Sequence, residues 1–369
     1  MKAQIAVLGA GNGAHAFAGH LALRGHRVRV YNQFAGEIAD LQARGGVDLE
    51  GVVQGFGALE LVTTDIGPVV AEADLILVVV PATAHRVMAE ACAPHLREGQ
   101  MVVLNPGRTG GALEFRNVLR RMGVTARVLV AEAQTLLYTC RISGPARVRV
   151  TCVKHRVRLA ALPARDTGPV LAQLRPLYPQ FEPAADVLET GLDNIGAVFH
   201  PAGTILSAAR IESGAAFEFY GDLTPSAVRL MEAIDAERLA VAHAFGVAVP
   251  SAGEWLAQSY EGIAGETLHE RIRSCGAYRG IPAPRSLDTR YVWEDVPTGL
   301  VPLVALGTIA GLTMPACVGL VNVASALLRR DFWQEGRNAT RLGLAGLHIA
   351  QLKALVRAEL NGRGDASAG

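Results

Sequence analysis

The sequence predicts an α/β fold in which a doubly wound parallel sheet with added antiparallel strands is followed by an all-α domain. Three observations predict it. A glycine-rich turn joins an apolar strand to a helix near residue 10, apolar runs recur as far as residue 162, and helical periodicity dominates after residue 185. Because single cores rarely grow beyond about 250–300 residues, a chain of 369 residues is expected to form two domains. We place these domains at residues 1–185 and 186–362.

The first thirty residues are typical of a βαβ unit, and the segment GAGNGA at 9–14 fits the G-x-G-x-x-G/A pattern. Gly9 can turn sharply, Gly11 lets the backbone approach a pyrophosphate, and Ala14 lets the helix pack on the strand. The phosphates would lie at the helix N-terminus, whose free N–H groups favour anions. A purely structural turn is the alternative. We interpret the pattern as a Rossmann dinucleotide site formed by Gly9, Gly11, Asn12, Gly13 and Ala14.

The second strand is followed by Asn32, which bears on the choice between NAD and NADP. An acidic residue there would accept a hydrogen bond from the ribose 2′-OH of NAD, whereas an arginine would accommodate the NADP phosphate. The Asn32 side chain can hydrogen-bond a ribose hydroxyl without repelling a phosphate, and no arginine follows it directly. The sequence therefore does not decide between NAD and NADP. Ligands of such sheets bind outside the carboxyl ends of the strands, which favours Pro81 and Asn105 as cofactor contacts, although the loop at Asn105 is equally well explained as an ordinary turn.

Apolar periodicity predicts the remaining elements of the first domain. We expect strands at 4–8, 26–31, 59–63, 73–80, 101–104 and 127–131, and helices at 14–23, 66–73, 84–95, 112–121 and 164–177. Residues 40–57 are polar and predict loop and edge structure. Alternating apolar and basic residues at 139–162 predict antiparallel strands added to the sheet. Their basic side chains, Lys154 among them, are expected to form a solvated face, because aromatic partners for nucleic-acid bases are missing.

The second domain is predicted to be helical throughout. We expect helices at 194–209, 225–245, 251–260, 264–274, 300–310 and 315–328. Residues 296–328 carry no charge and are long enough to span a membrane, but prolines and glycines interrupt them. Two buried helices are therefore favoured over a membrane span.

The composition points to a small-molecule partner. Charged residues make up 19% and hydrophobic residues 50% of the chain, a composition that argues against disorder. The net charge of +1 gives no electrostatic reason to expect binding to nucleic acid or to an anionic membrane. The five cysteines are scattered and never form C-x-x-C, so we expect reduced core thiols, no metal site and a cytoplasmic protein.

His200 is the strongest candidate for chemistry. It lies in an apolar helical segment, where an unpaired imidazole would be costly to bury, and Asp295 is the best partner by context. A carboxylate bonded to one imidazole nitrogen fixes the tautomer and raises the pKa of the ring, so the other nitrogen can exchange a proton. A core histidine bonded to a backbone carbonyl is the alternative. Arg290 is either a surface ion-pair residue or a bidentate clamp for a carboxylate.

These segments, in this order, resemble the octopine/nopaline dehydrogenase family, also called the opine dehydrogenases. The resemblance covers nearly the whole chain, and its histidine-proline and EDV-x-TGLVP elements are more specific than the glycine motif. The matching stretches are VLGAGNGAHAFAGHLALRGH at 7–26, LNPGRTGGALEFR at 104–116, YTCR at 138–141, NIGAVFHP at 194–201, AYRGI at 277–281 and TRYVWEDVPTGLVPL at 289–303.

The resemblance implies a Rossmann domain, a helical domain, and an active site between them. Such enzymes join the amino group of an amino acid to a 2-oxo acid such as pyruvate and reduce the imine with NADH or NADPH. By the same resemblance, His200 is the acid/base residue, Asp295 its partner and Arg290 a carboxylate ligand. Thr139 is a further candidate for substrate binding. Where a related enzyme has an acidic residue for the ribose, this chain has Asn32, so the cofactor preference does not carry over.

Two other functions fit parts of the pattern. A simple 2-oxo-acid reductase of the ketopantoate-reductase or sugar-phosphate dehydrogenase type usually has a lysine in its catalytic helix, and residues 194–209 contain none. A non-catalytic, nucleotide-sensing Rossmann protein is the second, and the joint presence of His200, Asp295 and Arg290 argues against it. The sequence is compatible with a homodimer but does not identify the amino acid, the oxo acid or the stereochemistry of the product.

Overall fold

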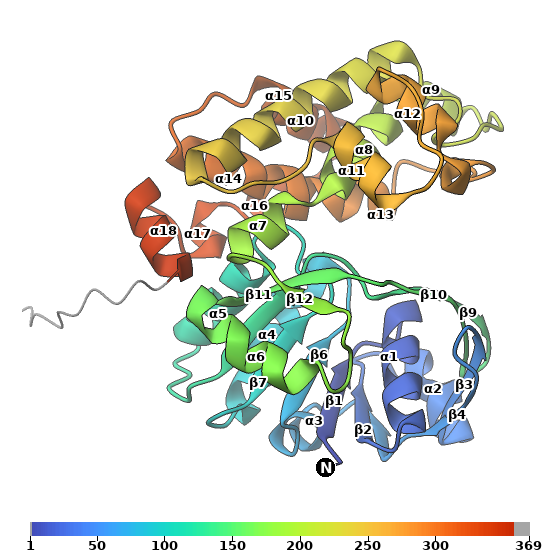
Figure 1. Ribbon diagram of the computed structural model, residues 1–369, viewed down its shortest axis with the longest axis vertical. Coiled ribbons are helices and arrows are strands. Elements are labelled where there is room, and N and C mark those ends of the chain that lie inside the picture. The colour runs from blue at the N-terminus through green and yellow to red at the C-terminus, as the bar shows by residue number, and fades with distance from the viewer. Residues whose placement is uncertain (1, 358–369) are drawn as a thin grey trace, which may run out of the picture.

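The computed structural model describes residues 2–357. An eight-stranded sheet in the order β12-β11-β8-β7-β6-β1-β2-β5 forms the centre of the first domain (Figure 1). Its central strands pair in parallel, while β8 and β11 pair antiparallel. The strands are β1 Gln4–Leu8, β2 Arg27–Tyr31, β5 Leu61–Thr63, β6 Leu75–Val78, β7 Met101–Leu104, β8 Leu129–Ala133, β11 Val157–Leu162 and β12 Phe181–Pro183.

The sheet is buried on both faces because its strands are apolar on both sides, as expected of a doubly wound fold. Alternate residues of β1, Ala6 and Leu8, pack with helices α3, α4 and α5, whereas Ile5 and Val7 pack with α1, α2 and α6. The helices are α1 Asn12–Leu23, α2 Ala35–Arg44, α3 Gly67–Ala71, α4 His85–Cys92, α5 Gly111–Arg121 and α6 Thr167–Leu174.

A second, four-stranded sheet corrects two expectations. Residues 40–57 form the end of α2 and two strands rather than loop, and most of the antiparallel strands at 139–162 join this separate sheet instead of extending the main one. Only β11 joins the main sheet. The strands of the second sheet are β3 Gly46–Gly51, β4 Gly55–Ala58, β9 Tyr138–Gly144 and β10 Arg147–Val153, in the order β4-β3-β10-β9.

The second sheet forms because segments about one hundred residues apart pair with each other. β3 pairs in parallel with β10, and their buried residues, such as Leu49 and Val150, face α1. Each strand alone is short and partly polar, so local periodicity does not reveal the partner.

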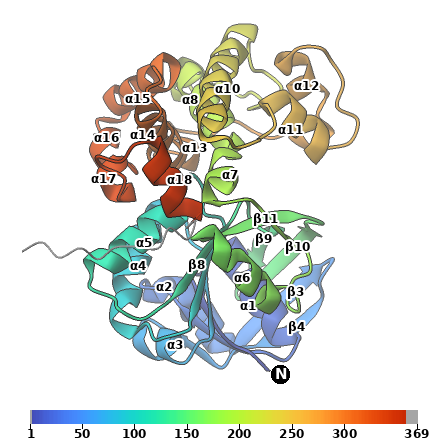
Figure 2. The same cartoon turned by 60° about the vertical axis from the view of Figure 1, so that its left-hand side comes forward.

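The helical domain begins after β12 and lies over one end of the sheet (Figures 1 and 2). The helices predicted at 225–245 and 315–328 are confirmed to the residue, and the one predicted at 194–209 divides into α8 and α9. The α-helices of the helical domain are α7 Val187–Leu192, α8 Ile195–Leu206, α9 Ala208–Glu212, α10 Pro225–Phe245, α11 Ala252–Ser259, α12 Leu268–Ser274, α13 Arg290–Trp293, α14 Val301–Ile309, α15 Pro315–Leu328, α16 Phe332–Glu335, α17 Ala339–Leu342 and α18 Ile349–Arg357.

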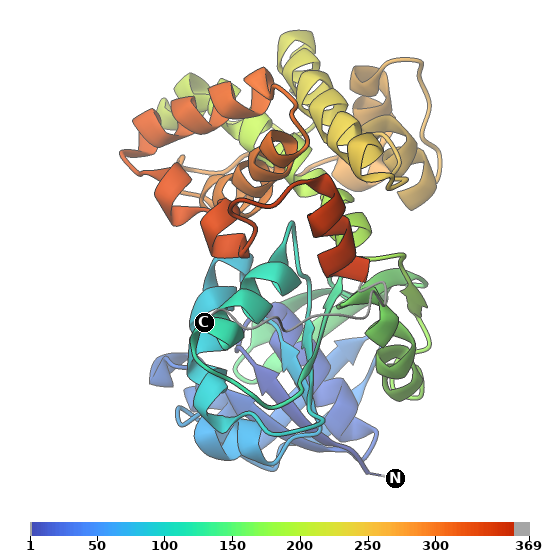
Figure 3. The same cartoon turned by 90° about the vertical axis from the view of Figure 1, so that its left-hand side faces the viewer.

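The last elements of the chain return to the first domain. In Figure 3, α17 and α18 lie between the helical domain and the sheet domain, and the Nε of Arg357 is 3.0 Å from Asp186. Residues 296–328 form a π-helical turn followed by two separate helices, α14 and α15, as expected from their prolines and glycines. Among residues 2–357, none of the helices combines the length and the apolar character that crossing a membrane requires.

Candidate active site

The glycine turn has the geometry that a dinucleotide requires. Gly9 has a φ of +123°, and a Cβ there would lie 2.4 Å from the carbonyl oxygen of Val79, so this position needs glycine. At Gly11, immediately before α1, a Cβ would meet nothing within 4 Å. The open space therefore lies at the N-terminus of a helix, where a pyrophosphate is favoured. Ala14 is 1% exposed and packs the helix against the sheet.

Two other residues of the motif have structural contacts. A Cβ on Gly13 would lie 3.0 Å from side-chain atoms of Val79 and Leu136, so helix and strand approach closely here. The side-chain oxygen of Asn12 accepts a hydrogen bond of 2.8 Å from the backbone N–H of Ile142 on β9. The Asn12 side chain thus ties the glycine turn to the second sheet.

Asn32 lies at the end of β2 and is buried, but it does not act alone. Its amide nitrogen donates to the carboxylate of Glu37 at 2.7 Å, and its oxygen accepts from the backbone N–H of Phe34 at 3.0 Å. Glu37 therefore places a carboxylate beside Asn32, just after the carboxyl end of β2. The residues at the strand end give no signal for Glu37, because it lies in the first turn of the following helix.

Pro81 and Asn105 follow β6 and β7 at the carboxyl edge of the sheet. Asn105 is 1% exposed, and neither polar atom of its side chain has a hydrogen-bond partner among the described residues. A buried amide without partners is costly, so this position suits a ligand that carries its own donor and acceptor, such as the carboxamide of a nicotinamide. The residues present therefore fit a dinucleotide.

The side chains of His200 and Asp295, which are 95 residues apart in the chain, are in contact as predicted. The Nδ1 of His200, on α8, is 2.8 Å from an Asp295 carboxylate oxygen at the start of a π-helical turn. Burial alone would raise the pKa of Asp295, which is 1% exposed, but the charges of Arg108 and His200 hold that pKa below its ordinary value. Asp295 is therefore a carboxylate, and the Nδ1–H of His200 donates to it.

Aromatic side chains surround the other side of the imidazole. The hydroxyl of Tyr220 lies 3.1 Å from the Nε2 of His200, and the ring of Tyr291 stacks on the imidazole with centroids 4.3 Å apart. Burial raises the pKa of Tyr220 well above its ordinary value, so the phenol is neutral and can donate to Nε2. The sequence offered no signal for Tyr220, which lies in a turn without a motif, whereas Tyr291 lies on α13, inside the stretch at 289–303 that carries the family resemblance, and was not singled out there.

A cavity of about 610 Å³ opens beside this pair, between the two domains. It is lined from both sides, by Arg108, Thr139 and Lys154 of the first domain and by His200, Tyr220 and Tyr278 of the second. Thr139 lines the cavity, and its role in substrate binding stays a prediction. The prediction that Lys154 belongs to a solvated face was wrong, because its side chain is partly buried in the cavity wall.

The prediction of core thiols was wrong for one cysteine. All five cysteines are free, and Cys152 is exposed whereas the other four are buried.

Arg290 forms an ion pair instead of facing the cavity. Its Nε donates to the carboxylate of Glu294, one turn along the chain, and it is absent from the residues that line the cavity. Glu294 is buried and also accepts from the backbone N–H of Ala82 at 2.8 Å. The contact matches the ion-pair alternative for Arg290, and its role as a carboxylate clamp stays a prediction.

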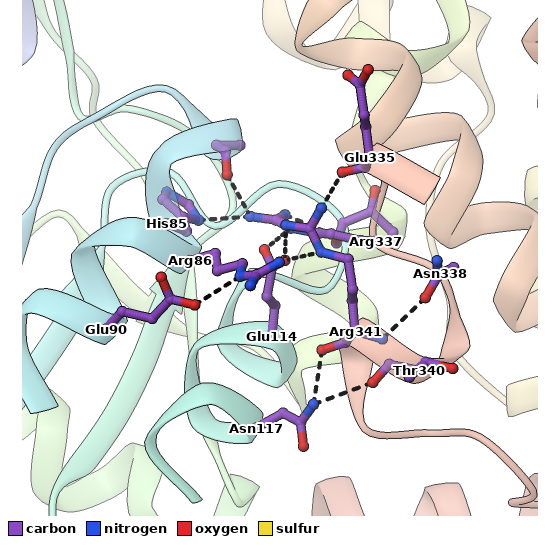
Figure 4. A network of polar contacts seen from close by, with 12 residues as sticks. His85, Arg86, Glu90, Glu114, Asn117, Glu335, Arg337, Asn338, Thr340 and Arg341 are labelled. Carbon is purple, nitrogen blue, oxygen red and sulfur yellow. Dashed lines mark hydrogen bonds and ion pairs between the residues drawn. The ribbon is translucent and has the colours of Figure 1, made fainter. Parts of the chain in front are cut away.

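Arg337 fixes the loops that follow β6 and β7 to the helical domain (Figure 4). It is fully buried, and its five N–H groups all find acceptors. These acceptors are a carboxylate oxygen of Glu114, the carbonyls of Ala82, Gly107 and Thr109, and the Nδ1 of His85. The segments that carry Pro81, Asn105 and Arg108 are thus held in place from the other domain.

The sequence of this chain matches known families and relatives. Residues 183–328 match the family described as "NAD/NADP octopine/nopaline dehydrogenase, alpha-helical domain", and residues 4–145 match the NAD-dependent glycerol-3-phosphate dehydrogenase N-terminus. Over 353 residues, the chain is 44% identical to an opine dehydrogenase of Arthrobacter sp. (strain 1C), an alignment that covers 95% of this chain and 98% of that one. The chain belongs to the opine dehydrogenase family. The predicted enzyme class, an NAD(P)-dependent dehydrogenase acting on CH–NH bonds, is confirmed.

Solved structures confirm the fold class. An octopine dehydrogenase structure with NADH and L-arginine matches with a TM-score of 0.82 at 23% identity, covering 98% of this chain and 100% of that chain. A ketopantoate reductase from Ralstonia eutropha JMP134 matches with a TM-score of 0.58 at 21% identity, covering 89% and 98%. The second likeness explains why a simple 2-oxo-acid reductase fits part of the sequence pattern: the two-domain plan is shared.

Proposed function

We propose that this opine dehydrogenase condenses an amino acid with a small 2-oxo acid such as pyruvate, and reduces the resulting imine with a nicotinamide cofactor. The observation that carries the proposal is the His200–Asp295 pair, 2.8 Å apart at an interdomain cavity whose first-domain wall continues from the cofactor loops. The same cavity would hold both substrates, because a condensation requires their reacting atoms to lie side by side.

Gly9, Gly11, Gly13 and Ala14 would hold the cofactor pyrophosphate, and Asn105 its carboxamide. When bound, the cofactor supplies the hydride that reduces the imine carbon. Every proton step falls to this chain's own residues. The condensation needs an acid to release water from the carbinolamine and to keep the imine protonated.

His200 is proposed to supply these protons. Asp295 accepts the Nδ1–H and stabilises the imidazolium, so that Nε2 can give a proton to the departing hydroxyl and take one from the amine. Tyr220, 3.1 Å from Nε2, is neutral and can accept or donate at that nitrogen as its charge changes. The stacked ring of Tyr291 keeps the imidazole in the plane that both contacts require.

For the cofactor we propose a preference for NADH over NADPH. The carboxylate of Glu37, 2.7 Å from the Asn32 amide, would accept from a ribose hydroxyl and repel a 2′-phosphate. The first experiment is the loss of reduced-nicotinamide absorbance with either cofactor, pyruvate and a pool of amino acids, omitting each component in turn. Oxidation that needs both pyruvate and an amine supports the proposal. Oxidation with the oxo acid alone would replace it with the simple reductase.

We further propose a domain boundary between residues 185 and 186, a cytoplasmic location and a homodimer. The five free cysteines suit a reducing compartment. Val323 and Leu327, one turn apart on α15, are each 48% exposed and offer an apolar surface for a second copy. Light scattering of the purified protein tests the oligomeric state, and a monomer at all concentrations would contradict the dimer.

A further inference from the structure

Lys154 is an unusual residue in this chain. The protein has 35 lysines and arginines together, and its lysines are Lys2, Lys154 and Lys353. Lys154 follows β10, is partly buried, and lines the cavity that also contains His200. Its Nζ donates to the hydroxyl of Thr135 at 2.7 Å. Among residues 2–357, no carboxylate oxygen lies within ion-pair distance of this ammonium group.

A second cation lies close by. Arg108, from the loop after β7, also lines the cavity; its Nη1 donates to Asn194 at 3.1 Å, and its buried Nε has no partner among the described residues. Its nearest carboxylate is Glu294, 3.8 Å from Nη2 and shared with Arg290. Burial, and then the charge of Arg108, lower the pKa of Lys154 to about 8.

The acidic residue in the cavity wall does not balance these charges. Asp193 accepts from the side chain of Gln134, and burial raises the pKa of Asp193 to about 7, so its carboxyl group is only partly ionised near neutral pH. Placing an ammonium out of water beside a guanidinium is unfavourable unless an anion lies with them. Arg108 has the buried carboxylates of Glu294 and Asp295 near it, but among the described residues Lys154 has none, so an anionic ligand in the cavity would supply the partner that its ammonium lacks.

We propose that Lys154, with Arg108 beside it, binds a carboxylate of the substrate. This inference rests on the proposed function, in which both the amino acid and the 2-oxo acid carry a carboxylate. The hydroxyl of Thr135 holds the ammonium on the cavity side of the second sheet. The subsite differs from the one expected at Arg290, whose guanidinium is already paired with Glu294 outside the cavity lining.

Steady-state kinetics of Lys154→Met test the assignment. Because a hydrogen bond to a charged group is worth a factor of about 10–100, the KM of one substrate should rise by about that factor, while the KM of the cofactor stays unchanged. A higher KM for the oxo acid assigns the subsite to the oxo-acid carboxylate, and a higher KM for the amino acid assigns the subsite to the amino-acid carboxylate. Lys154→Arg should recover part of the loss. Lys353→Met, on α18 and outside the cavity, is the matched control. Unchanged KM values for both substrates in Lys154→Met would overturn the proposal.

A second measurement does not depend on turnover. The wild-type protein, saturated with cofactor, is acetylated with N-hydroxysuccinimide acetate, and each of the three lysines is followed by peptide mass spectrometry. Because the amino group of an added amino acid also consumes the reagent, the rate of Lys154 is measured relative to that of Lys353. Pyruvate or the amino acid should lower this ratio at least several-fold, whereas neutral pyruvamide should leave it unchanged. An equal ratio with and without both carboxylates would reject the subsite. Protection without wild-type turnover would instead reject the proposed function and leave the carboxylate site standing.

Discussion

Replacing Arg337 with methionine should lower the free energy of unfolding by about 3–5 kcal/mol, the usual effect of breaking a buried ion pair. The side chain is fully buried and satisfies a carboxylate, three backbone carbonyls and His85. Methionine has a similar length but donates nothing, so Glu114 would keep Arg341 as its remaining guanidinium partner. The loss is a large part of a total stability that is typically about 5–15 kcal/mol.

Urea unfolding measures this change. The tryptophans Trp255, Trp293 and Trp333 all lie in the helical domain, so their fluorescence follows that domain while circular dichroism follows the whole chain. With a denaturant slope of about 3 kcal/mol per molar, the midpoint should fall by about 1–1.7 M.

Arg330→Met is the matched control. Arg330 pairs with Glu335 at the surface, with both side chains 39% exposed, and such pairs contribute about 0–1 kcal/mol. If Arg337→Met and Arg330→Met unfold at the same urea concentration, the reasoning that Arg337 joins the two domains is wrong.

The remaining predictions concern the reaction and its cofactor. His200→Ala should lower kcat by about 10²–10⁴-fold while the cofactor Kd, measured by fluorescence titration, stays within twofold; equal turnover would remove His200 from the mechanism. Gly11→Val should weaken cofactor binding at least tenfold without lowering the melting temperature, because a Cβ there meets nothing within 4 Å of the protein. Glu37→Gln should narrow the preference for NADH over NADPH in kcat/KM, and an unchanged ratio would show that its charge does not discriminate. Because the Lys154 ammonium is charged below its pKa of about 8, the KM of the substrate that it binds should be lowest below pH 8 and rise above it, a trend that Lys154→Met should abolish.

Elements with a strong local signal could be predicted closely from the sequence. β1 and β7 are buried on both faces and appear as continuous apolar runs, so their predicted and observed bounds agree. Helix α10 begins at the Thr224 cap, with Pro225 in its first turn, and ends at Gly246 with a φ of +67°, signals that lie in the sequence itself. The second sheet could not be predicted, because its strands are stabilised by each other and not by their own periodicity.

The candidate site divides in the same way. His200 and Asp295 could be proposed because an apolar helix makes a lone histidine conspicuous, and the tertiary structure brings their atoms to 2.8 Å. Lys154 was misjudged because it sits in a run of basic residues, most of which are solvent-exposed. Arg337 carries no sequence signal at all, since an arginine in a short polar stretch is usually a surface residue.

By itself, the sequence determined the fold class, the place of the glycine turn, the most regular helices and strands, and the opine dehydrogenase family. Each of these depends on residue types at short spacing, where capping, turn chemistry and apolar periodicity act locally. Only the tertiary structure decided which charges are paired. It brought Glu294 to 3.8 Å from Arg108, buried Arg337 between the domains, and left Lys154 and Arg108 together in one cavity. The physical reason is that burial and ion pairing depend on distances between segments far apart in the chain, which no local pattern records.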